Sequence, residues 1–334
     1  MAPNLKNLKR ARHSLWQRYQ KTYDPIHQED VSGFQKKGEH EAYMLSRFPA
    51  TYGACCSVFA RLFETAAFQE WSRDVFTDNV TVLDIGSGPG TASLALCDTL
   101  LNYQSGIIPN SITCIDQDDP MLEKCTHHLK ERCKKLITTH NIISPTTAFP
   151  PADVVIMSYM LAEVTHLQQE HVLSKAFLAA KHALILINPG TSSLFPVFLK
   201  WRQKLISLGG FIAAPCPHMT HCPLDPDLSK NSPHTGPGWC HFKTRIARTR
   251  DMKFLKNATM SFEDEPYNYL IILKKPLSSV PSARVMNAPQ KRKGHLHMHL
   301  CTEGTINHKT FSARIDNYQS IKKTAWGDGI VKLI

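Results

Sequence analysis

The sequence predicts an α/β protein whose core is a Rossmann-like, mostly parallel sheet. Residues 80–85 form a run of buried-type, β-branched side chains that stops at a glycine-rich loop, and residues 91–101 follow with a helical pattern. A run without polar alternation is typical of a strand covered on both faces, as in a parallel sheet. Strand and helix patterns then alternate up to about Pro189, with short connections that suit right-handed βαβ units.

The loop after the first predicted strand carries Gly86, Gly88 and Gly90 at the amino end of the predicted helix. Glycine permits positive φ angles and close approach of a ligand, and a helix N-terminus attracts negative charge. Dinucleotide-binding loops have the pattern Gly-x-Gly-x-x-Gly, whereas this loop has Gly-x-Gly-x-Gly preceded by Asp84. The pattern resembles the first motif of S-adenosylmethionine-dependent methyltransferases, which implies a class I methyltransferase fold. The alternative is another doubly wound α/β domain.

The second predicted strand, residues 112–116, ends in the carboxylate of Asp116. A carboxylate can accept hydrogen bonds from both ribose hydroxyls of a nucleoside, and the resemblance implies this role for it. The predicted cofactor-binding residues are Asp84, Gly86, Ser87, Gly88, Gly90, Asp116, Gln117 and Ser158.

The remaining elements of the predicted sheet domain are a helix at 120–136, a strand at 153–158, a helix at 165–181, a strand at 183–187 and a final strand at 267–273. In an active methyltransferase, residues 158–163 would orient the acceptor, because ligands bind at the carboxyl ends of parallel strands. They contain neither the Asn/Asp-Pro-Pro-aromatic tetrad that holds an exocyclic base nitrogen nor a Pro-Cys nucleophile. Methylation of base amino groups or of pyrimidine C5 is therefore disfavoured.

The chain has 334 residues, a formal net charge of +11 and a pI of about 9.1. We expect an N-terminal helical region at 1–75, a methyltransferase domain at 76–210 and a cysteine-rich module with closing strands at 211–334. The positive charge favours a polyanionic partner, either nucleic acid or an acidic membrane face. No apolar run approaches the ~18 residues that span a bilayer, and the N-terminus lacks the apolar core of a secretory signal. We therefore expect a soluble intracellular protein.

Three cysteines, Cys216, Cys222 and Cys240, lie among prolines and histidines, and Cys301 ends the alternating stretch 295–301. Thiolates select zinc, copper(I) or iron–sulfur clusters, and Cys-Pro steps are familiar beside such clusters. No Cys-x-x-Cys pair occurs, so the spacing is not that of a zinc ribbon. The alternatives are buried, unligated thiols or zinc with histidine ligands drawn from His218, His221, His234 and His241. The remaining cysteines are predicted to be structural: Cys55, Cys56, Cys97, Cys114, Cys125 and Cys133.

The cysteine segment also carries a family resemblance. The glycine loop together with Pro215-Cys-Pro-His, Cys222-Pro-Leu, Trp239-Cys-His-Phe, the stretch 295–301 and Trp326-Gly-Asp resembles the methyltransferase-like family of mitochondrial small-ribosomal-subunit assembly proteins and their bacterial relatives. The similarity runs over about residues 47–328. It implies association with the small subunit during assembly, S-adenosylmethionine in the glycine-loop pocket, and a [4Fe-4S] cluster held by Cys216, Cys222, Cys240 and Cys301. Asn188 stands where the family pattern has a glutamate, which weakens the case for catalysis.

Basic residues gather in four segments, which are residues 4–18, 243–256 (opposed only by Asp251), Arg284 and residues 291–293. They predict salt-sensitive, largely sequence-independent contact with rRNA phosphates, although a basic N-terminal stretch is also typical of a packing helix or a mitochondrial targeting peptide.

Taken together, the sequence predicts a small-subunit ribosome assembly or translation factor that binds rRNA, with S-adenosylmethionine and the cluster as structural or sensing ligands. One alternative is an active S-adenosylmethionine-dependent rRNA methyltransferase, since methyl transfer proceeds largely through proximity and alignment. The other is a zinc-binding RNA-binding protein with a degenerate methyltransferase domain. The expected partners are small-subunit rRNA and assembly intermediates, without membrane or DNA. A bacterial cytoplasmic location is favoured, with the mitochondrial matrix as the location of a eukaryotic chain.

Overall fold

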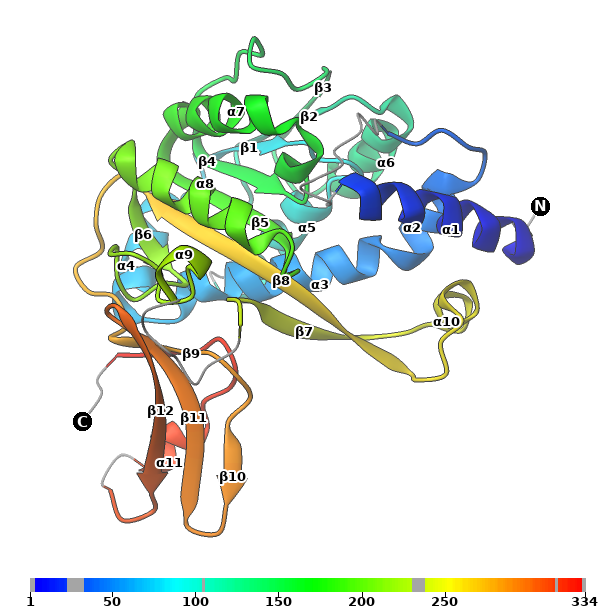
Figure 1. The fold of residues 1–334 in the computed structure, drawn as a ribbon. Coiled ribbons are helices and arrows are strands. Elements are labelled where there is room, and N and C mark those ends of the chain that lie inside the picture. The colour runs from blue at the N-terminus through cyan, green and yellow to red at the C-terminus, as the bar shows by residue number, and fades with distance from the viewer. Residues whose placement is uncertain (1–3, 23–32, 104–105, 230–237, 316–317, 332–334) are drawn as a thin grey trace.

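The computed structural model describes residues 4–22, 33–103, 106–229, 238–315 and 318–331 (Figure 1). Its main sheet has the strand order β3–β2–β1–β4–β5–β8–β6, with β7 paired to β8. The five strands β1 to β5 run parallel, whereas β8 is antiparallel to β5, β6 and β7. The bounds are β1 Thr81–Ile85, β2 Ser111–Asp116, β3 Lys135–His140, β4 Ala152–Ser158, β5 Ala180–Pro189, β6 Phe211–Ala214, β7 Phe242–Ala247 and β8 Phe262–Leu273. This is the predicted Rossmann-like α/β sheet, closed on one side by antiparallel strands.

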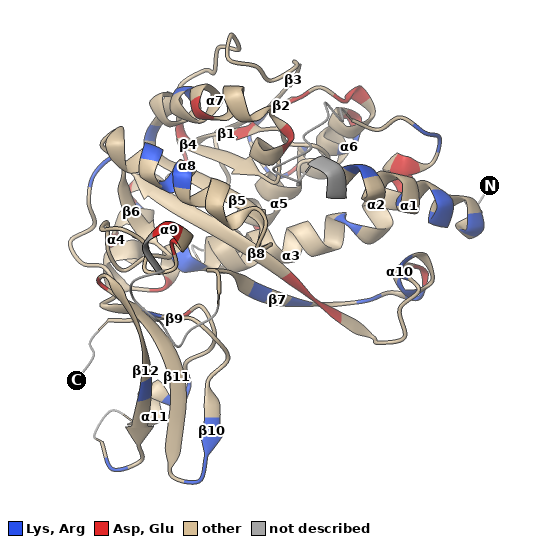
Figure 2. Ribbon diagram, in the orientation of Figure 1, with Lys and Arg blue, Asp and Glu red and all other residues tan. Residues whose placement is uncertain are grey.

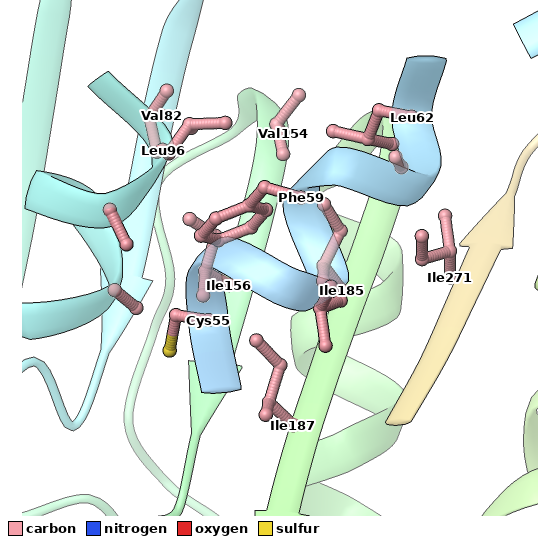
Figure 3. Close-up of a cluster of buried hydrophobic side chains, with 14 of the residues drawn as sticks. Cys55, Phe59, Leu62, Val82, Leu96, Val154, Ile156, Ile185, Ile187 and Ile271 are labelled. Carbon is pink, nitrogen blue, oxygen red and sulfur yellow. The ribbon is translucent and has the colours of Figure 1, made fainter. Parts of the chain in front are cut away.

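Helices cover both faces of the main sheet and explain the apolar character of its strands. On β1, Val82 packs into the cluster beneath α3 to α6, and Leu83 packs into the opposite cluster beneath α7 and α8. Figure 3 shows Phe59 of α3 against Val154 and Ile156 of β4. The bounds are α3 Phe48–Phe59, α4 Ala66–Val75, α5 Thr91–Tyr103, α6 Asp119–Leu129, α7 His166–Ala179 and α8 Phe195–Ser207, with short 3-10 helices η1 Ala60–Phe63 and η2 Leu161–Glu163.

Two further N-terminal helices, α1 (Leu5–Thr22) and α2 (Glu39–Ser46), lie beside the sheet domain. Helix α1 contacts α2 and α10 (Arg250–Lys256) and buries Leu8, Ala11 and Leu15. The basic stretch therefore forms a helix that packs one face against the rest of the protein, which was one of the predicted alternatives. None of the described helices is long and apolar enough to cross a lipid bilayer.

The prediction of one helix over residues 120–136 is wrong at its end. Helix α6 stops at Leu129, and β3 begins at Lys135 as an edge strand parallel to β2. Most of the side chains of β3 are exposed, so this strand lacks the apolar run that marks the buried strands. The sequence also did not predict β6 and β7. The predicted domain boundary at 210/211 falls between α8, which covers the main sheet, and β6, which is a strand of that sheet.

A second, antiparallel sheet projects from the body (Figure 1). It contains β9 (Ala283–Val285), β10 (Gln290–Arg292), β11 (His295–Thr302), β12 (Thr305–Ser312) and β13 (Gly329–Ile330). The order is β10–β11–β9–β13, and β12 also pairs with β11. One face of this second sheet forms a small core with α11 (Tyr318–Ile321). The remaining short helix, α9 (Pro226–Ser229), follows the loop that carries Cys222.

Candidate functional site

The glycine loop connects β1 to α5, and two of its glycines, Gly86 and Gly88, line the cleft described below. Gly86 has a φ of 68°, and a Cβ there would lie 2.5 Å from Cβ of Met160. Gly88 has a φ of 52° but faces open space. The first glycine therefore permits close packing against η2, and the second leaves the backbone accessible to a ligand.

Asp116 ends β2 next to this loop, as the sequence predicted. Its carboxylate accepts hydrogen bonds from the backbone N–H groups of Gly88 (2.7 Å) and Asp118 (3.0 Å). Burial raises the pKa of Asp116, while these two donors oppose that rise. Each carboxylate oxygen still has acceptor capacity for a hydroxyl group.

A cleft with a volume of about 360 Å³ opens at the carboxyl ends of β1, β2 and β4. Its lining includes three carboxylates, from Asp116, Asp118 and Glu163, and no lysine, arginine or histidine among the described residues. Enclosure by the cleft walls and the nearby charge of Asp116 raise the pKa of Glu163 to about 8. The cleft is therefore electrostatically suited to a cationic ligand and unsuited to a pyrophosphate.

The structure divides the predicted cofactor residues into two groups. Those that line the cleft are Gly86, Gly88, Asp116, Gln117 and Ser158. Asp84, Ser87 and Gly90 do not line it. Asp84 is fully buried and accepts hydrogen bonds from the backbone N–H (3.2 Å) and hydroxyl (2.7 Å) of Ser93 in α5. Burial raises the pKa of Asp84 to about 6, so Asp84 joins strand to helix beneath the loop. Asn188 is buried in β5 and does not line the cleft either.

Aromatic side chains from the N-terminal region complete the cleft wall: Tyr19 of α1, Phe34 in the segment before α2, and Tyr43 of α2. Phe34 packs edge-on against Tyr43 and stacks on His40, whose Nε2 lies 2.9 Å from Oδ1 of Asp118. The sequence predicted an N-terminal helical region over these residues. It did not indicate Tyr19 or Phe34, because their place depends on how α1 and α2 pack.

The four predicted metal-binding cysteines line one cavity between the two sheets. They come from four segments: Cys216 follows β6, Cys222 lies in the next loop, Cys240 precedes β7 and Cys301 lies on β11. The open space between them is small, about 20 Å³. Burial and the neighbouring thiol of Cys216 raise the pKa of Cys222 to about 12. All ten cysteines are free thiols.

No three histidine, cysteine or carboxylate side chains among the described residues are placed to hold a single metal ion. His218 also lines the cavity, with its Nε2 3.7 Å from Sγ of Cys301. His241 stacks on Trp239 instead, and His221 is exposed. His234, the remaining histidine alternative, lies outside the described residues. Five of the cysteines predicted to be structural are buried in the main core: Cys55, Cys97, Cys114, Cys125 and Cys133. The sixth, Cys56, is partly buried against it.

Two buried arginines line the same cavity, and the sequence did not indicate either role. Arg202 of α8 donates through Nη2 to the backbone oxygens of His218 (3.1 Å) and Thr220 (2.8 Å), and its Nε is buried without a partner. Arg284 of β9 donates to Glu64 and to Pro215 O (2.7 Å), and its Nη2 is likewise buried without a partner. Both are at most 2% exposed. Two unpaired cationic donors beside four thiols are a donor set that suits an anionic sulfur-containing group.

The predicted basic surface is in part wrong. Carboxylates on β8 pair with the cations of β7 and α10, so the segment 243–256 is opposed by more than Asp251. Nε of Arg245 lies 2.7 Å from Oδ1 of Asp264, and Nη2 of Arg248 lies 3.0 Å from Oε2 of Glu263. Arg284 is buried rather than surface-exposed. The sequence could not reveal these pairings because they depend on the register between β7 and β8.

The strand order, the glycine loop and the acidic cleft define a Rossmann-like α/β protein of the class I methyltransferase type. Residues 37–331 match the family model described as "Mitochondrial small ribosomal subunit Rsm22", and the chain belongs to this family, which confirms the resemblance drawn from the sequence.

Named relatives agree with this assignment. The human "Ribosome assembly protein METTL17, mitochondrial" is 24% identical over 271 residues, covering 74% of this chain and 54% of the relative. The "Rsm22-cox11 tandem protein 2, mitochondrial" of Schizosaccharomyces pombe is 22% identical over 345 residues, covering 86% and 42%. The chain thus spans about half the length of these relatives. Among solved structures, magnesium protoporphyrin IX methyltransferase from Synechocystis with bound S-adenosylmethionine is similar with a TM-score of 0.38 and 13% identity, covering 78% of this chain and 91% of that one.

Proposed function

We propose that this chain is a small-ribosomal-subunit assembly protein that binds rRNA, with S-adenosylmethionine in the glycine-loop cleft and a [4Fe-4S] cluster at the four cysteines. Membership of the Rsm22 family supports the assembly role. The observation that carries the cofactor proposal is the acidic lining of the cleft. S-adenosylmethionine combines a sulfonium, an ammonium and one carboxylate, so its net charge is positive.

The cleft residues have distinct roles in this proposal. The backbone at Gly86 and Gly88 would take the methionine part of S-adenosylmethionine, and Asp116 would accept hydrogen bonds from the ribose hydroxyls. Glu163 would offset the positive charge of the ligand. When bound, the cofactor supplies an electrophilic methyl group. Phe34 and Tyr43 would shield the adenosine side of the cleft from water.

The cluster proposal is supported by the donor set in the cavity. A [4Fe-4S] cluster takes four cysteine thiolates and is anionic, so it would supply acceptors for the unpartnered N–H groups of Arg202 and Arg284. Zinc is the less favoured alternative, because the described residues contain no group of three ligands placed around one ion. Once bound, the cluster would cross-link four chain segments, including both sheets.

Anaerobic purification of the full chain, with iron, sulfide and zinc analysis, tests the cluster. About four irons and four sulfides per chain are expected, whereas one zinc in a colourless protein would contradict the proposal. The assembly role is tested by depletion: small subunits should become scarce and their precursors accumulate. Normal subunit levels after depletion would contradict that role, whatever the metal.

An active rRNA methyltransferase is the second candidate, and one observation favours it. Tyr159, at the end of β4 in the cleft, has a φ of 60° although it is not glycine. Non-glycine residues in this region store strain that clusters at active sites. A variant that cannot bind the cofactor, Gly88→Trp, should then lack a methyl mark on small-subunit rRNA. An unchanged methylation map would reject catalysis and leave the assembly role intact.

The location of the protein follows the relatives in this proposal. The human and fission yeast relatives are named as mitochondrial proteins, which supports the mitochondrial matrix for a eukaryotic chain. The favoured bacterial cytoplasmic location has no support from them.

A further inference from the structure

One face of the projecting sheet carries a row of histidines. On β11 the side chains alternate: Leu296, Met298 and Leu300 are buried in the small core, whereas His295, His297 and His299 lie on the opposite face. The register with β12 adds His308 directly across from His299. We call His295, His297, His299 and His308 the histidine face.

The rings of the histidine face contact one another as a platform. His297 and His308 stack with centroids 5.6 Å apart and an interplanar angle of 17°, and His295 stacks on His297 at 6.4 Å and 29°. Nδ1 of His297 is 2.9 Å from Oγ1 of Thr310, which fixes its orientation. His295 and His308 are exposed and His297 is half-buried. Exposed aromatic rings on an open sheet face, such as those of His295 and His308, are suited to stacking on a nucleobase.

The charge around this face is positive and unopposed, in contrast to β7. Arg292 of β10 pairs with His295 of β11 and therefore lies on the histidine face, whereas Lys291 pairs with Leu296 and lies on the opposite face; Lys293 lies in the turn between the two strands. All three cations are exposed, and none has an ion pair with a described carboxylate. Within residues 286–315 the only acid is Glu303, in the turn at the other end of β11. Figure 2 shows the basic residues along β10.

We propose that the histidine face docks a single-stranded segment of rRNA, whose bases stack on His297 and His308 while Arg292 on the same face and Lys293 in the adjoining turn neutralise its phosphates. The inference rests on the proposed rRNA-binding function and names its surface. An exposed sheet that combines stacking rings with cations fits unpaired bases, because the bases of a duplex are not available to stack on protein. A metal at these histidines is not favoured, since no three described ligands are placed around one ion.

The test measures binding of the full chain to a 12-nucleotide single-stranded RNA and to a duplex of equal length, by fluorescence anisotropy over a salt series. The double variant His297→Ala/His308→Ala should weaken single-strand binding about ten-fold or more, since each stacked base contributes on the order of 1–3 kcal/mol. Its salt dependence should stay unchanged. The matched control is His127→Ala/His171→Ala, two exposed histidines on α6 and α7, and should bind like the parent.

A second pair of variants separates stacking from other roles of the histidines. His297→Phe/His308→Phe keeps the rings and should retain affinity, whereas a hydrogen-bonding or metal role would be lost in it. Arg292→Ala/Lys293→Ala should instead reduce the slope of log K against log salt by about 0.7 per lost phosphate contact.

The outcomes also separate this inference from the function on which it rests. If the parent chain binds the RNA and the alanine double variant binds equally well at an unchanged melting temperature, the histidine face is not the docking surface. Loss of bound Zn²⁺ with unchanged RNA affinity would assign the histidines to a metal and overturn the inference. If the parent itself binds neither the oligonucleotide nor small-subunit rRNA, the proposed rRNA-binding function fails first.

Discussion

A buried ion pair between Glu64 and Arg284 connects the N-terminal region to the second sheet and offers a quantitative test. Nη1 of Arg284 lies 2.7 Å and 2.9 Å from the two carboxylate oxygens of Glu64, and Arg284 also donates to Gly327 O (2.9 Å). Arg284 is 1% exposed. Its bond to Pro215 O holds the residue before Cys216. Removing Glu64 leaves the buried guanidinium of Arg284 without a carboxylate, whereas removing Arg284 leaves Glu64 with Arg61 as its remaining partner (2.9 Å).

Replacing Glu64 by leucine should lower the free energy of unfolding by about 3–5 kcal/mol, a large part of the roughly 5–15 kcal/mol of a typical domain. Arg284→Met, in which methionine fills a comparable space, should cost less, because Glu64 keeps Arg61 as a partner. The double variant should cost less than the sum, with a coupling energy of about 1–3 kcal/mol, because neither charge is then left buried. Arg61 keeps Asp328 as a partner in every variant.

Urea unfolding at pH 7 of the parent chain, the two single variants and the double variant measures this coupling energy. Arg245→Met breaks an exposed ion pair with Asp264, whose side chains are 63% and 37% exposed, and should leave the midpoint unchanged. Costs that add within about 0.5 kcal/mol would refute the pair as a coupled unit.

The pH dependence of stability tests this ion pair independently. Burial opposes ionisation of Glu64, but Arg284 and Arg61 outweigh it and lower its pKa below the ordinary value of 4.5. The stabilisation is therefore complete above pH 4.5 and is lost as pH falls further. Glu64→Gln should flatten this acid limb.

Three further predictions concern the two candidate sites. Gly88→Phe should abolish S-adenosylmethionine binding by calorimetry, because it places a strained side chain in the cleft, while the melting temperature falls only slightly; retained affinity would move the cofactor elsewhere. Cys222→Ser should remove the metal content and destabilise the chain, whereas Cys56→Ser, outside the cavity, should keep the metal; equal content in both would reject the ligand set. Because the raised pKa of Glu163, about 8, keeps it largely protonated at pH 6.5, binding of the cationic cofactor there should release protons and tighten as pH rises. Calorimetry in buffers of different ionisation enthalpy measures the release, and Glu163→Gln should diminish it.

The sequence predicted the parts of the cleft that depend on local pattern. The apolar run of β1, the glycine loop and Asp116 are adjacent in the chain or follow the next strand, so parallel pairing alone brings them together. The four cysteines were also predicted as one set, and they line one cavity. Edge strand β3 escaped prediction because an exposed strand has no apolar run to mark it.

What the sequence could not supply are contacts between distant elements. Arg202 and Arg284 lie on α8 and β9, far apart in the chain, and only the packing of the second sheet against α8 aims both at the cysteines. Likewise, β8 with its acidic residues follows the basic strand β7 closely in the chain, with α10 between them. The register between the two strands decides which acid lies beside which cation. The pattern of charges alone therefore overstated the basic surface of the body.

This correction changes where an RNA contact is expected. A surface on which each cation faces a carboxylate contributes little net field, since the pairs are screened and compensated. Around β7 and α10, the cations Arg245, Arg248 and Lys256 are compensated by carboxylates of β8, whereas β10 carries basic residues without a carboxylate beside them. The projecting sheet is therefore one surface on which positive charge of the chain is not compensated by nearby acids. Because Cys301 of the same strand β11 lies in the cysteine cavity, a ligand there would stiffen the base of the surface that docks RNA. The cavity and the histidine face are therefore two ends of one structural element, which explains why a metal site and an RNA surface would occur together.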